Sequence, residues 1–493
     1  MTKSEKISVR TTCPRDCYDA CGIVAIVRDG RISKVLGDPA HLRAQGALCG
    51  KCALAYNGVW LDPDRRLTRP LKRIGPKDSS QFKTVDWNEA LHDIAARLND
   101  IVSTTGAQSI LQTHYTGICS LIAGNFPCRF FNRLGATEVD PDTVCNKAGH
   151  EALRLMFGSS FFGFDPRSGE DTDCLLIWGA NPSCSAPHVH KNWIPKVHKN
   201  ARVIVVDPVR HETARTADLH LQLRPGTDAL LAFAMLHVMH RDKLLDEAFL
   251  ESHVLGWDDV LTDVVAMDLN YAANVTGVPR DQIEQAAHWY GSARSMLWLG
   301  QGVQRQANAG NVMRSVGLLP AATGNIGRVG TGILYMNAPP ARGVDMDWLN
   351  ATHLRPLSDS PPTVSHMDLA AILEDSLRSR ALFTWNNNIA ASSPEQGRLR
   401  QALRREDLLH IAIDVFPTDT TCYADYVLPA SSFLEFDDLL LSYFDYTISA
   451  QVQVVPPTGE SLPNQEIFRR LADAMGFDDP ELPGSDASLL SDL

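Results

Sequence analysis

Short apolar runs alternate with amphipathic segments along most of the chain. Residues 84–106 predict an amphipathic helix capped by Asp86. Its apolar positions recur at helical spacing, at Ala90, Leu91, Ile94, Ala95 and Leu98. The next residues, SILQTHYTG (109–117), predict a strand that enters a glycine-containing loop. The same alternation continues toward the end of the chain, so we expect a mostly parallel α/β architecture.

Three other segments depart from this alternation. The run GIVAIVRDGRISKVL (22–36) has two strand-like halves around Asp29-Gly30, which predicts a hairpin. Residues 62–83 are rich in Pro and Arg, and we expect them to form a connector. The final segment, LPGSDASLLSDL (482–493), is rich in Ser and Asp, and we expect a disordered tail.

An internal repeat relates two distant parts of the chain. The segment from Asn181 to Leu221 matches the segment from Asn388 to Leu428 without a gap, at a constant offset of 207 residues. In each copy an apolar strand precedes a helix, and a second apolar strand ends in Asp207 or Asp414. A helix that follows a strand end favours a bound phosphate, and an acid at the end of the next strand can hold a ribose or base. The repeat therefore predicts two related nucleotide sites facing one another, or one retained and one decayed; chance similarity of two α/β units is the alternative.

Composition limits the classes of function. The 493 residues are 44% hydrophobic and 21% charged, which is typical of a soluble protein with two to four domains. The formal net charge of −12 argues against nucleic acid as a main partner. No apolar run is long enough to span a bilayer, and the start MTKSEKISVR lacks a signal-peptide core. We therefore expect a cytoplasmic protein, with attachment to a membrane partner left open.

The cysteines near the N-terminus form the strongest chemical signal. Cys13, Cys17 and Cys21 form a tight triplet, and Cys49 follows after a long loop. Such a triplet plus one distant thiolate is typical of iron–sulfur ligation, whereas structural zinc sites more often use two close pairs. Zinc or unliganded thiols remain the alternatives, and Cys52 is a spare thiol in this interpretation. Disulfides are disfavoured because nothing in the sequence indicates export.

Several stretches, in order, resemble the molybdopterin oxidoreductases of the dimethyl-sulfoxide-reductase type. They are CPRDCYDAC with LCGK, RFFNRLGATEVDPDTVCNKAG, IWGANPSCSAPH, VVDPVRHETARTADLHLQLRPGTDALL, LPAATGNIGRVGTG, WNNNIAASSP, DVFPTDTTCYADYVLPASSFLE and GESLPNQEIFRRLADAMG. The resemblance implies a 4Fe-4S cluster and a bis-molybdopterin guanine dinucleotide carrying molybdenum or tungsten. It also implies an α/β fold with a small β-rich iron–sulfur domain (1–62) and two pseudo-symmetric Rossmann-like domains. One of these is discontinuous (63–135 and 346–493), and the other spans 136–345. Relatives continue into a C-terminal barrel domain that this sequence lacks, so we expect that the barrel is a separate subunit, that the chain is incomplete, or that the cofactor binds weakly.

The resemblance also assigns roles to individual residues. Cys13, Cys17, Cys21 and Cys49 would bind the cluster, although three residues rather than the more usual two separate the first pair. Lys51 matches the lysine between cluster and pterin, and Cys145 matches the protein ligand of molybdenum or tungsten. The first dinucleotide site would use Asn181, Asp207, Arg210, Thr227 and Asp228. The second would use Gln301, Asn387, Asp414, Phe436 and Asn464.

The implied activity is two-electron redox chemistry on a small substrate, with electrons relayed through the cluster to a carrier protein or an iron–sulfur subunit. Asn146 stands where formate dehydrogenases of this family usually have His, which argues against formate. A non-catalytic electron-transfer or scaffold subunit is the first alternative. A non-redox hydratase or transhydroxylase of the same family is the second. The sequence does not indicate the substrate.

Overall fold

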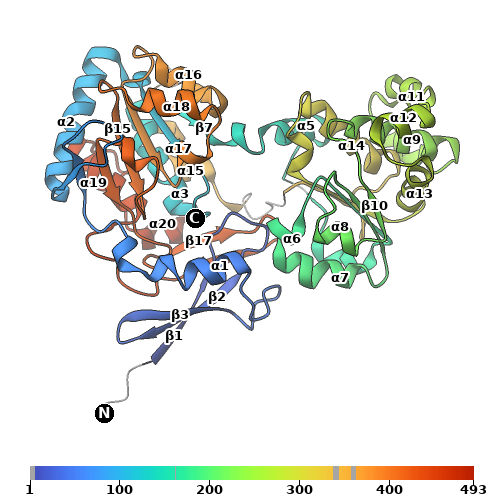
Figure 1. The fold of residues 1–493 in the computed structure, drawn as a ribbon, viewed down its shortest axis with the longest axis horizontal. Helices are drawn as coiled ribbons and strands as arrows, with labels where there is room; N and C mark the ends of the chain where they lie inside the picture. The colour runs from blue at the N-terminus through green and yellow to red at the C-terminus, as the bar shows by residue number, and fades with distance from the viewer. Residues whose placement is uncertain (1–5, 162, 337–342, 357–361) are drawn as a thin grey trace.

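A computed structural model describes residues 6–161, 163–336, 343–356 and 362–493. These residues form a small N-terminal unit and two α/β lobes (Figure 1). The first lobe is built on a five-stranded sheet, and the second lobe is built on an eight-stranded sheet. The mixed α/β fold expected from the sequence is therefore confirmed. Within the described ranges, no helix is both long and apolar enough to cross a bilayer.

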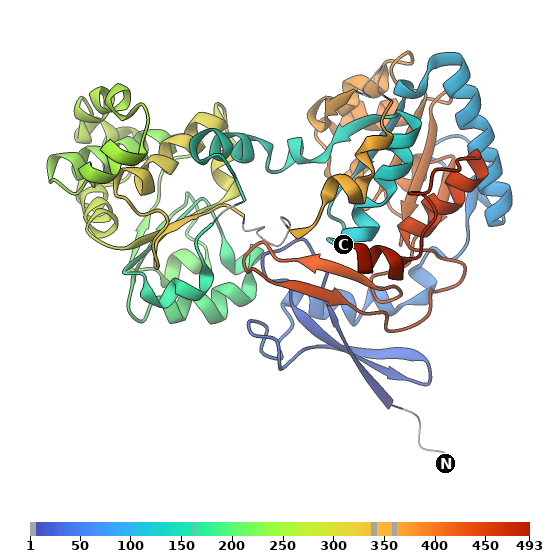
Figure 2. The ribbon, with the colours of Figure 1, turned by 180° about the vertical axis from the view of Figure 1, so that it is seen from behind.

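The N-terminal unit is an antiparallel sheet of β1 (Lys6–Thr12), β2 (Gly22–Arg28) and β3 (Arg31–Gly37), followed by α1 (Gly50–Tyr56). The expected hairpin is present, and Asp29 and Gly30 turn it with φ values of 49° and 75°. A two-stranded ribbon of β17 (Asp438–Leu441) and β18 (Ile448–Gln451) lies beside β1, as the view from behind shows (Figure 2). The Thr12 hydroxyl donates to the Ala450 carbonyl at 2.8 Å across this junction. Residues distant in sequence thus complete the N-terminal unit.

The first lobe has the strand order β10-β9-β8-β11-β12, and all its strands are parallel. Its strands are β8 (Cys174–Trp178), β9 (Arg202–Val206), β10 (Leu219–Leu221), β11 (Ser295–Leu299) and β12 (Gly332–Leu334). Its helices are α5 (Lys147–Phe157), α6 (Pro182–Ser185), α7 (Ile194–Val197), α8 (Glu212–Thr216), α9 (Asp228–Arg241), α10 (Glu247–His253), α11 (Trp257–Val265), α12 (Leu269–Thr276), α13 (Arg280–Gly291) and α14 (Ala309–Ala322). Strands β8 and β11 are buried along their whole length, because helices cover both faces of a parallel sheet.

The second lobe has the strand order β13-β7-β6-β14-β15-β16-β4-β5. Its strands are β4 (Leu71–Arg73), β5 (Phe82–Thr84), β6 (Ile110–His114), β7 (Thr137–Asp140), β13 (Thr363–Ser365), β14 (Ala381–Trp385), β15 (Leu409–Asp414) and β16 (Tyr426–Pro429). Its helices are α2 (Trp87–Thr105), α3 (Leu121–Asn125), α4 (Pro127–Leu134), α15 (Met346–Asn350), α16 (Leu369–Glu374), α17 (Ile389–Ser392), α18 (Gln396–Leu403), α19 (Asn464–Met475) and α20 (Asp486–Asp492). Two separate parts of the chain contribute to this sheet, the first with β4 to β7 and the second with β13 to β16. Because β7 belongs to the sheet, the first part extends beyond the expected boundary at residue 135.

Two expectations about loop segments are wrong. The stretch expected as a connector contributes to β4, which pairs antiparallel with β16, and to β5, which pairs antiparallel with β4. The expected disordered tail contains α20, where Leu489 is buried against Ile122 and Phe126. Asp486 at its start binds Arg469 at 2.6 Å. Both errors have the same cause, because local composition does not reveal a partner surface supplied by a distant part of the chain.

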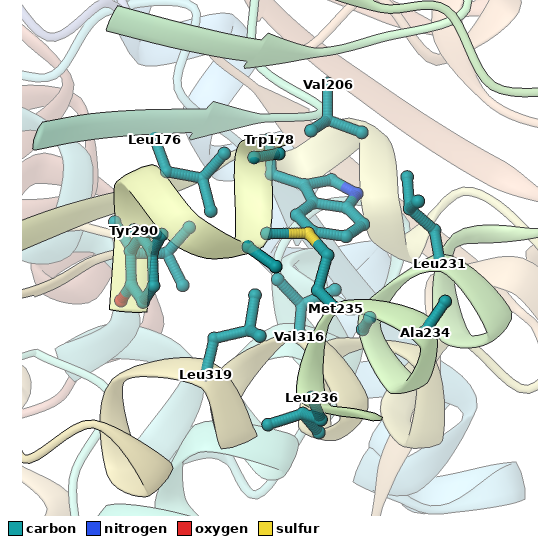
Figure 3. Packing of buried hydrophobic residues seen from close by; sticks show 14 of the residues in the cluster. Leu176, Trp178, Val206, Leu231, Ala234, Met235, Leu236, Tyr290, Val316 and Leu319 are labelled. Carbon is teal, nitrogen blue, oxygen red and sulfur yellow. The ribbon is translucent and has the colours of Figure 1, made fainter. Parts of the chain in front are cut away.

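The core of the first lobe lies between its sheet and helices α9, α13 and α14 (Figure 3). Trp178 is fully buried there beside Leu231 and Met235, and its indole N–H donates to the Asp228 carboxylate at 2.8 Å. Burying an apolar side chain of this kind contributes about 1.5–3 kcal/mol. In the second lobe, α2 and α19 pack on one face, and α16 and α18 pack on the other. Asp86 caps α2 by accepting the backbone N–H of Glu89, as the sequence predicts.

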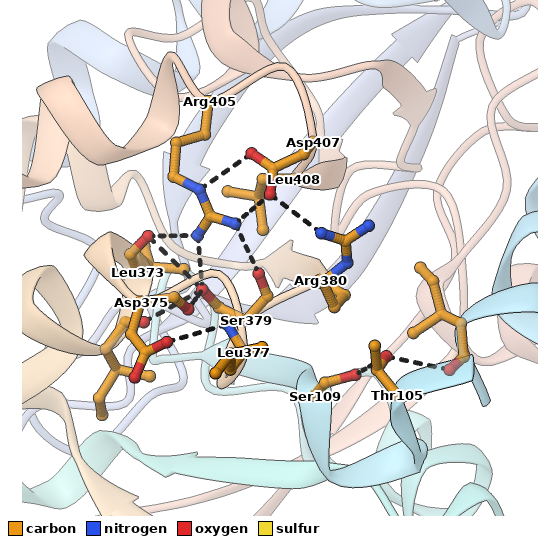
Figure 4. Close-up of polar contacts among 12 residues, drawn as sticks. Thr105, Ser109, Leu373, Asp375, Leu377, Ser379, Arg380, Arg405, Asp407 and Leu408 are labelled. Atoms are coloured by element: carbon orange, nitrogen blue, oxygen red, sulfur yellow. Dashed lines mark hydrogen bonds and ion pairs between the residues drawn. The ribbon is translucent and has the colours of Figure 1, made fainter. Parts of the chain in front are cut away.

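Polar contacts fix the helix connections at the edge of the second lobe (Figure 4). The Arg405 guanidinium donates to the Leu373 carbonyl at 2.6 Å, and to the Ser379 hydroxyl at 2.8 Å. The same side chain binds the Asp407 carboxylate at 2.6 Å. These bonds join the end of α16 to the turn after α18, where backbone carbonyls lack helical partners.

The internal repeat is a structural duplication. Strand pairs β8–β9 and β14–β15 have the same parallel register at an offset of 207 residues, and α6 and α17 begin at equivalent positions. The Thr213 hydroxyl accepts the N–H of Ser183 at 3.2 Å, and Thr420 accepts the equivalent N–H in the second copy at 3.0 Å. Asp218 and Asp425 each accept a strand N–H at 2.8 Å. Matching side-chain bonds at matching positions argue against chance similarity.

Candidate iron–sulfur and pterin site

The four cysteines expected at the cluster lie together, along with a fifth. The Cys13 sulfur is 3.7 Å from the Cys52 sulfur and 2.9 Å from the Tyr56 hydroxyl. The Cys13 N–H donates to the Cys21 carbonyl at 2.8 Å, which closes the triplet loop on itself. All eleven cysteines are free thiols. The donor set suits an iron–sulfur cluster, because Cys thiolates are the usual ligands of such clusters.

Burial and mutual proximity raise the pKa of Cys17, Cys21 and Cys49, so these three thiols keep their protons in the metal-free protein. Burial, with a smaller contribution from Asp19, raises the pKa of Cys17 to about 12. Burial is also the main cause that raises the pKa of Cys21, and the hydrogen bond with Cys52 is the main cause for Cys49. Metal binding must therefore displace protons, as thiolate ligation generally requires.

A cavity of about 310 Å³ lies next to the cluster site, and Cys145 lines it. Cys17 lines the same cavity, as do the ends of β8 and β11. Residues predicted for the cluster, for the metal and for the first dinucleotide, namely Cys17, Cys145 and Asn181, thus line one cavity. Its wall consists of Asp16, Cys17, Tyr18, Tyr115, Cys145, Asn146, Gly179, Ala180, Asn181, Cys184, Ser185, Gly300, Gln301, Gly302, Met336 and Tyr443.

Gln304 holds the loop that carries Cys145. Its side-chain oxygen accepts the Gly149 N–H at 2.9 Å, and its nitrogen donates to the Cys145 carbonyl and, at 2.7 Å, to the Tyr335 hydroxyl. A Cβ on Gly149 would lie 2.5 Å from the Tyr335 ring, so this helix position requires glycine. The buried amide therefore fixes the backbone on both sides of the thiol.

Several groups act on the Cys145 sulfur itself. Its Sγ lies 3.7 Å from Gln301 Oε1. Burial raises the pKa of Cys145, whereas the hydrogen bond from Tyr115 lowers it. Burial also raises the pKa of Tyr115 well above its ordinary value, so its hydroxyl stays protonated and donates. Arg305 donates to the Val144 carbonyl at 2.8 Å, and its charge favours the Cys145 thiolate.

The floor of the cavity depends on close contact between two glycine-rich strand ends. The Gly300 N–H donates to the Trp178 carbonyl at 2.7 Å. A Cβ on Gly300 would lie 2.2 Å from the Gly179 carbonyl oxygen, which is closer than atoms can approach. The loops after β8 and β11 therefore meet directly beneath the cavity.

Lys51 connects the cluster unit to this cavity. It stands on α1 between Cys49 and Cys52, and its Nζ donates to the Cys184 carbonyl at 2.8 Å. Cys184 lines the cavity. Lys51 therefore joins α1 to the wall of the Cys145 cavity, and its role between cluster and pterin stays a prediction.

A second cavity, of about 220 Å³, lies at the carboxyl ends of β14 and β15. It is lined by four of the residues predicted for the second dinucleotide: Asn387, Asp414, Phe436 and Asn464. Asn386, which the sequence analysis missed, also lines it, and its buried Nδ2 has no hydrogen-bond partner among the described residues. A buried donor without a partner costs about 1–3 kcal/mol, so the site favours a ligand that offers an acceptor.

The other predicted residues lie elsewhere. Gln301, assigned above to the second site, lines the first cavity beside Cys145. Asp207, Arg210, Thr227 and Asp228 follow strands β9 and β10 in the first lobe but line neither of these cavities. The Asp228 carboxylate already accepts the Trp178 indole and, at 2.9 Å, Gln306.

The sequence analysis assigned no role to two cavity residues close to Cys145. Asp16 accepts the Thr116 hydroxyl at 2.8 Å, and it stands directly before Cys17. Tyr115 directly follows β6. The available signals were the position of Tyr115 after a strand end and the position of Asp16 beside the predicted ligand Cys17. Only the fold brings these two residues together with Cys145.

Comparison with known proteins agrees with the geometry. Residues 66–474 match the molybdopterin oxidoreductase family, and residues 7–59 match the molybdopterin oxidoreductase Fe4S4 domain. The probable oxidoreductase YoaE of Bacillus subtilis is 34% identical over 98% of this chain and 70% of that protein. Formate dehydrogenase H of Escherichia coli is 27% identical over 95% of this chain and 68% of that protein.

The solved structure of acetylene hydratase from Pelobacter acetylenicus has the same fold, with a TM-score of 0.77 at 20% identity, over 95% of this chain and 69% of that chain. The two family matches indicate a molybdopterin cofactor with molybdenum or tungsten and a 4Fe-4S cluster. The chain therefore belongs to the molybdopterin oxidoreductase family.

Proposed function

We propose that this chain is the catalytic subunit of a redox enzyme in which a small substrate reacts beside Cys145. Cys13, Cys17, Cys21 and Cys49 would hold the cluster that takes up the electrons, and Lys51 would supply a fixed positive charge between the cluster and the cavity. The observation that carries the proposal is the shared cavity, because Cys17 and Cys145 line one space although 128 residues separate them. A carrier protein or an iron–sulfur subunit, in the cytoplasm, would take the electrons.

The cofactor is a bis-molybdopterin guanine dinucleotide in this proposal, and its metal supplies the two-electron exchange with the substrate. Cys145 would hold the metal as a thiolate, which soft metal centres accept. Asn181 and Gln301 would contact the pterin side. Asn387 and Asp414, in the second cavity, would hold one guanosine end, and Asp207 and Asp228 are proposed for the other.

The residues of the chain also provide proton handling at the reaction site. Tyr115 keeps its hydroxyl proton and points it at the Cys145 sulfur. Asp16 presents a carboxylate on the same cavity wall. A substrate in this space would meet the Tyr115 donor and the Asp16 acceptor among polar but uncharged side chains such as Gln301. Asn146 adds a neutral amide, which does not favour an anion such as formate.

Metal analysis of Cys145→Ser tests the proposal. We expect loss of most molybdenum or tungsten, with iron content and cluster absorbance unchanged. Cys184→Ser is the matched control, because this thiol lines the same cavity without a proposed ligand role. Unchanged molybdenum and tungsten in Cys145→Ser would overturn the assignment and favour a non-catalytic electron-transfer subunit. Turnover that needs no electron acceptor would instead indicate a hydratase or transhydroxylase.

A further inference from the structure

His188 is a buried histidine next to one of the cluster thiols. Its side chain is 3% exposed, and neither ring nitrogen has a hydrogen-bond partner among the described residues. A ring nitrogen of His188, the Cys21 sulfur and an Asp19 carboxylate oxygen all lie within 4.8 Å of one another. The imidazole therefore faces the cluster unit from the first lobe.

The backbone of His188 is held firmly in this position. The two oxygens of Asp19 accept the N–H groups of His188 and Val189 at 2.9 and 3.0 Å. Arg43 donates to the Asp19 carbonyl at 3.2 Å. A carboxylate of the cysteine loop thus fixes the start of the π-helical turn η6 (Val189–Trp193). The backbone of His188 cannot move away from the cysteine loop without breaking these bonds.

The ring lacks a partner only as long as Cys21 is a thiol. Buried polar atoms in folded proteins are nearly always hydrogen-bonded, so two unpartnered ring nitrogens are unfavourable. An imidazole carries at least one N–H donor whether it is neutral or protonated. A protonated thiol is a weak acceptor, whereas a thiolate is charged and accepts strongly. Ligation of iron by Cys21 would therefore supply the missing acceptor.

We propose that His188 donates a hydrogen bond to the Cys21 thiolate and thereby raises the reduction potential of the cluster. This inference rests on the proposed assignment of Cys21 as a cluster ligand. A hydrogen bond to a ligating sulfur draws electron density from it and stabilises the reduced, more negative cluster. His188 is then a positioning residue that favours electron transfer from the pterin cavity to the cluster.

The test is a redox titration of the cluster, followed by electron paramagnetic resonance, in anaerobically purified holoenzyme. His188→Phe removes both nitrogens but keeps a ring. We expect the equilibrium constant for cluster reduction to fall about tenfold, which is 59 mV for one electron. His188→Asn and His188→Gln keep a donor near the position of Nδ1 or Nε2, and we expect one of them to restore the wild-type potential.

The matched control is His190→Phe, two residues along the same turn. The His190 ring lies 3.2 Å from the Thr213 hydroxyl, and we expect no change in potential. An unchanged potential in His188→Phe would overturn the inference, as would an equal shift in His190→Phe. Iron loss in all three His188 variants would also overturn it, by making His188 a ligand. Absence of the cluster from the wild-type protein would refute the proposed function itself.

Discussion

Asp414 makes the second cavity sensitive to pH. It ends β15, and its Oδ1 accepts the N–H groups of Val415 and Phe416 at 2.7 and 3.2 Å. Burial nevertheless raises its pKa from 3.8 to about 6, against the lowering effect of these bonds. The substitution Asp414→Asn removes the titration and keeps the size of the side chain.

The sign and size of the effect follow from linkage. Between pH 3.8 and about 6 the folded protein keeps this proton while the unfolded chain loses it. The contribution of Asp414 to the free energy of unfolding therefore falls as pH rises through this window, and it stays constant above it. A difference of about two pKa units corresponds to about 3 kcal/mol.

Urea denaturation of cofactor-free wild-type protein and Asp414→Asn, at several pH values from 4 to 8, measures this contribution. Other titrating groups cancel in the difference between the two proteins at each pH. We expect wild type to lose up to about 3 kcal/mol relative to the variant between pH 4 and pH 7. Thr418→Val should extend the upper end of this window to higher pH, because the Thr418 hydroxyl lowers the pKa of Asp414 in the folded protein. A difference that does not change with pH would refute the reasoning.

Four further substitutions address the cluster and the scaffold. Cys17→Ser should lose most of the cluster iron, whereas Cys52→Ser should retain it, and iron loss in Cys52→Ser would show that the ligand set includes the fifth thiol. Lys51→Gln keeps a donor toward the Cys184 carbonyl but removes the charge. We expect Lys51→Gln to keep its full iron content and to have a lower cluster reduction potential. An unchanged potential would show that the Lys51 charge is too far from the cluster to affect it. Arg66→Met leaves Glu435, 2% exposed, without its two bonds at 3.0 and 2.9 Å. It should destabilise the protein by about 3–5 kcal/mol in urea, and a cost below about 1 kcal/mol would contradict this.

The sequence predicted features that depend on local pattern or on repetition. Asp86 caps α2 because a capping side chain needs only its own first turn. The repeat located β8, β9, β14 and β15 because a duplicated unit keeps both its apolar strands and its register.

Features that depend on distant contacts were not predicted. Gln304 resembles any polar residue after a strand, and only the fold brings its amide to Cys145 and Gly149. α20 is stabilised because Leu489 packs against Ile122 and Phe126, which lie more than 350 residues earlier in the chain. Gln301 belongs to the Cys145 cavity because β11 neighbours β8, a pairing between non-consecutive strands that periodicity does not reveal.

The equivalent bonds of Thr213 and Thr420, and of Asp218 and Asp425, have an evolutionary consequence. The Thr bonds hold the starts of α6 and α17, and the Asp bonds hold the amino ends of β9 and β15. The loops at the carboxyl ends of these strands can therefore diverge independently in the two halves while the inherited framework is unchanged. Exchanging only those loops between the halves would produce chimaeras that keep the framework but have exchanged part of the linings of the two cavities.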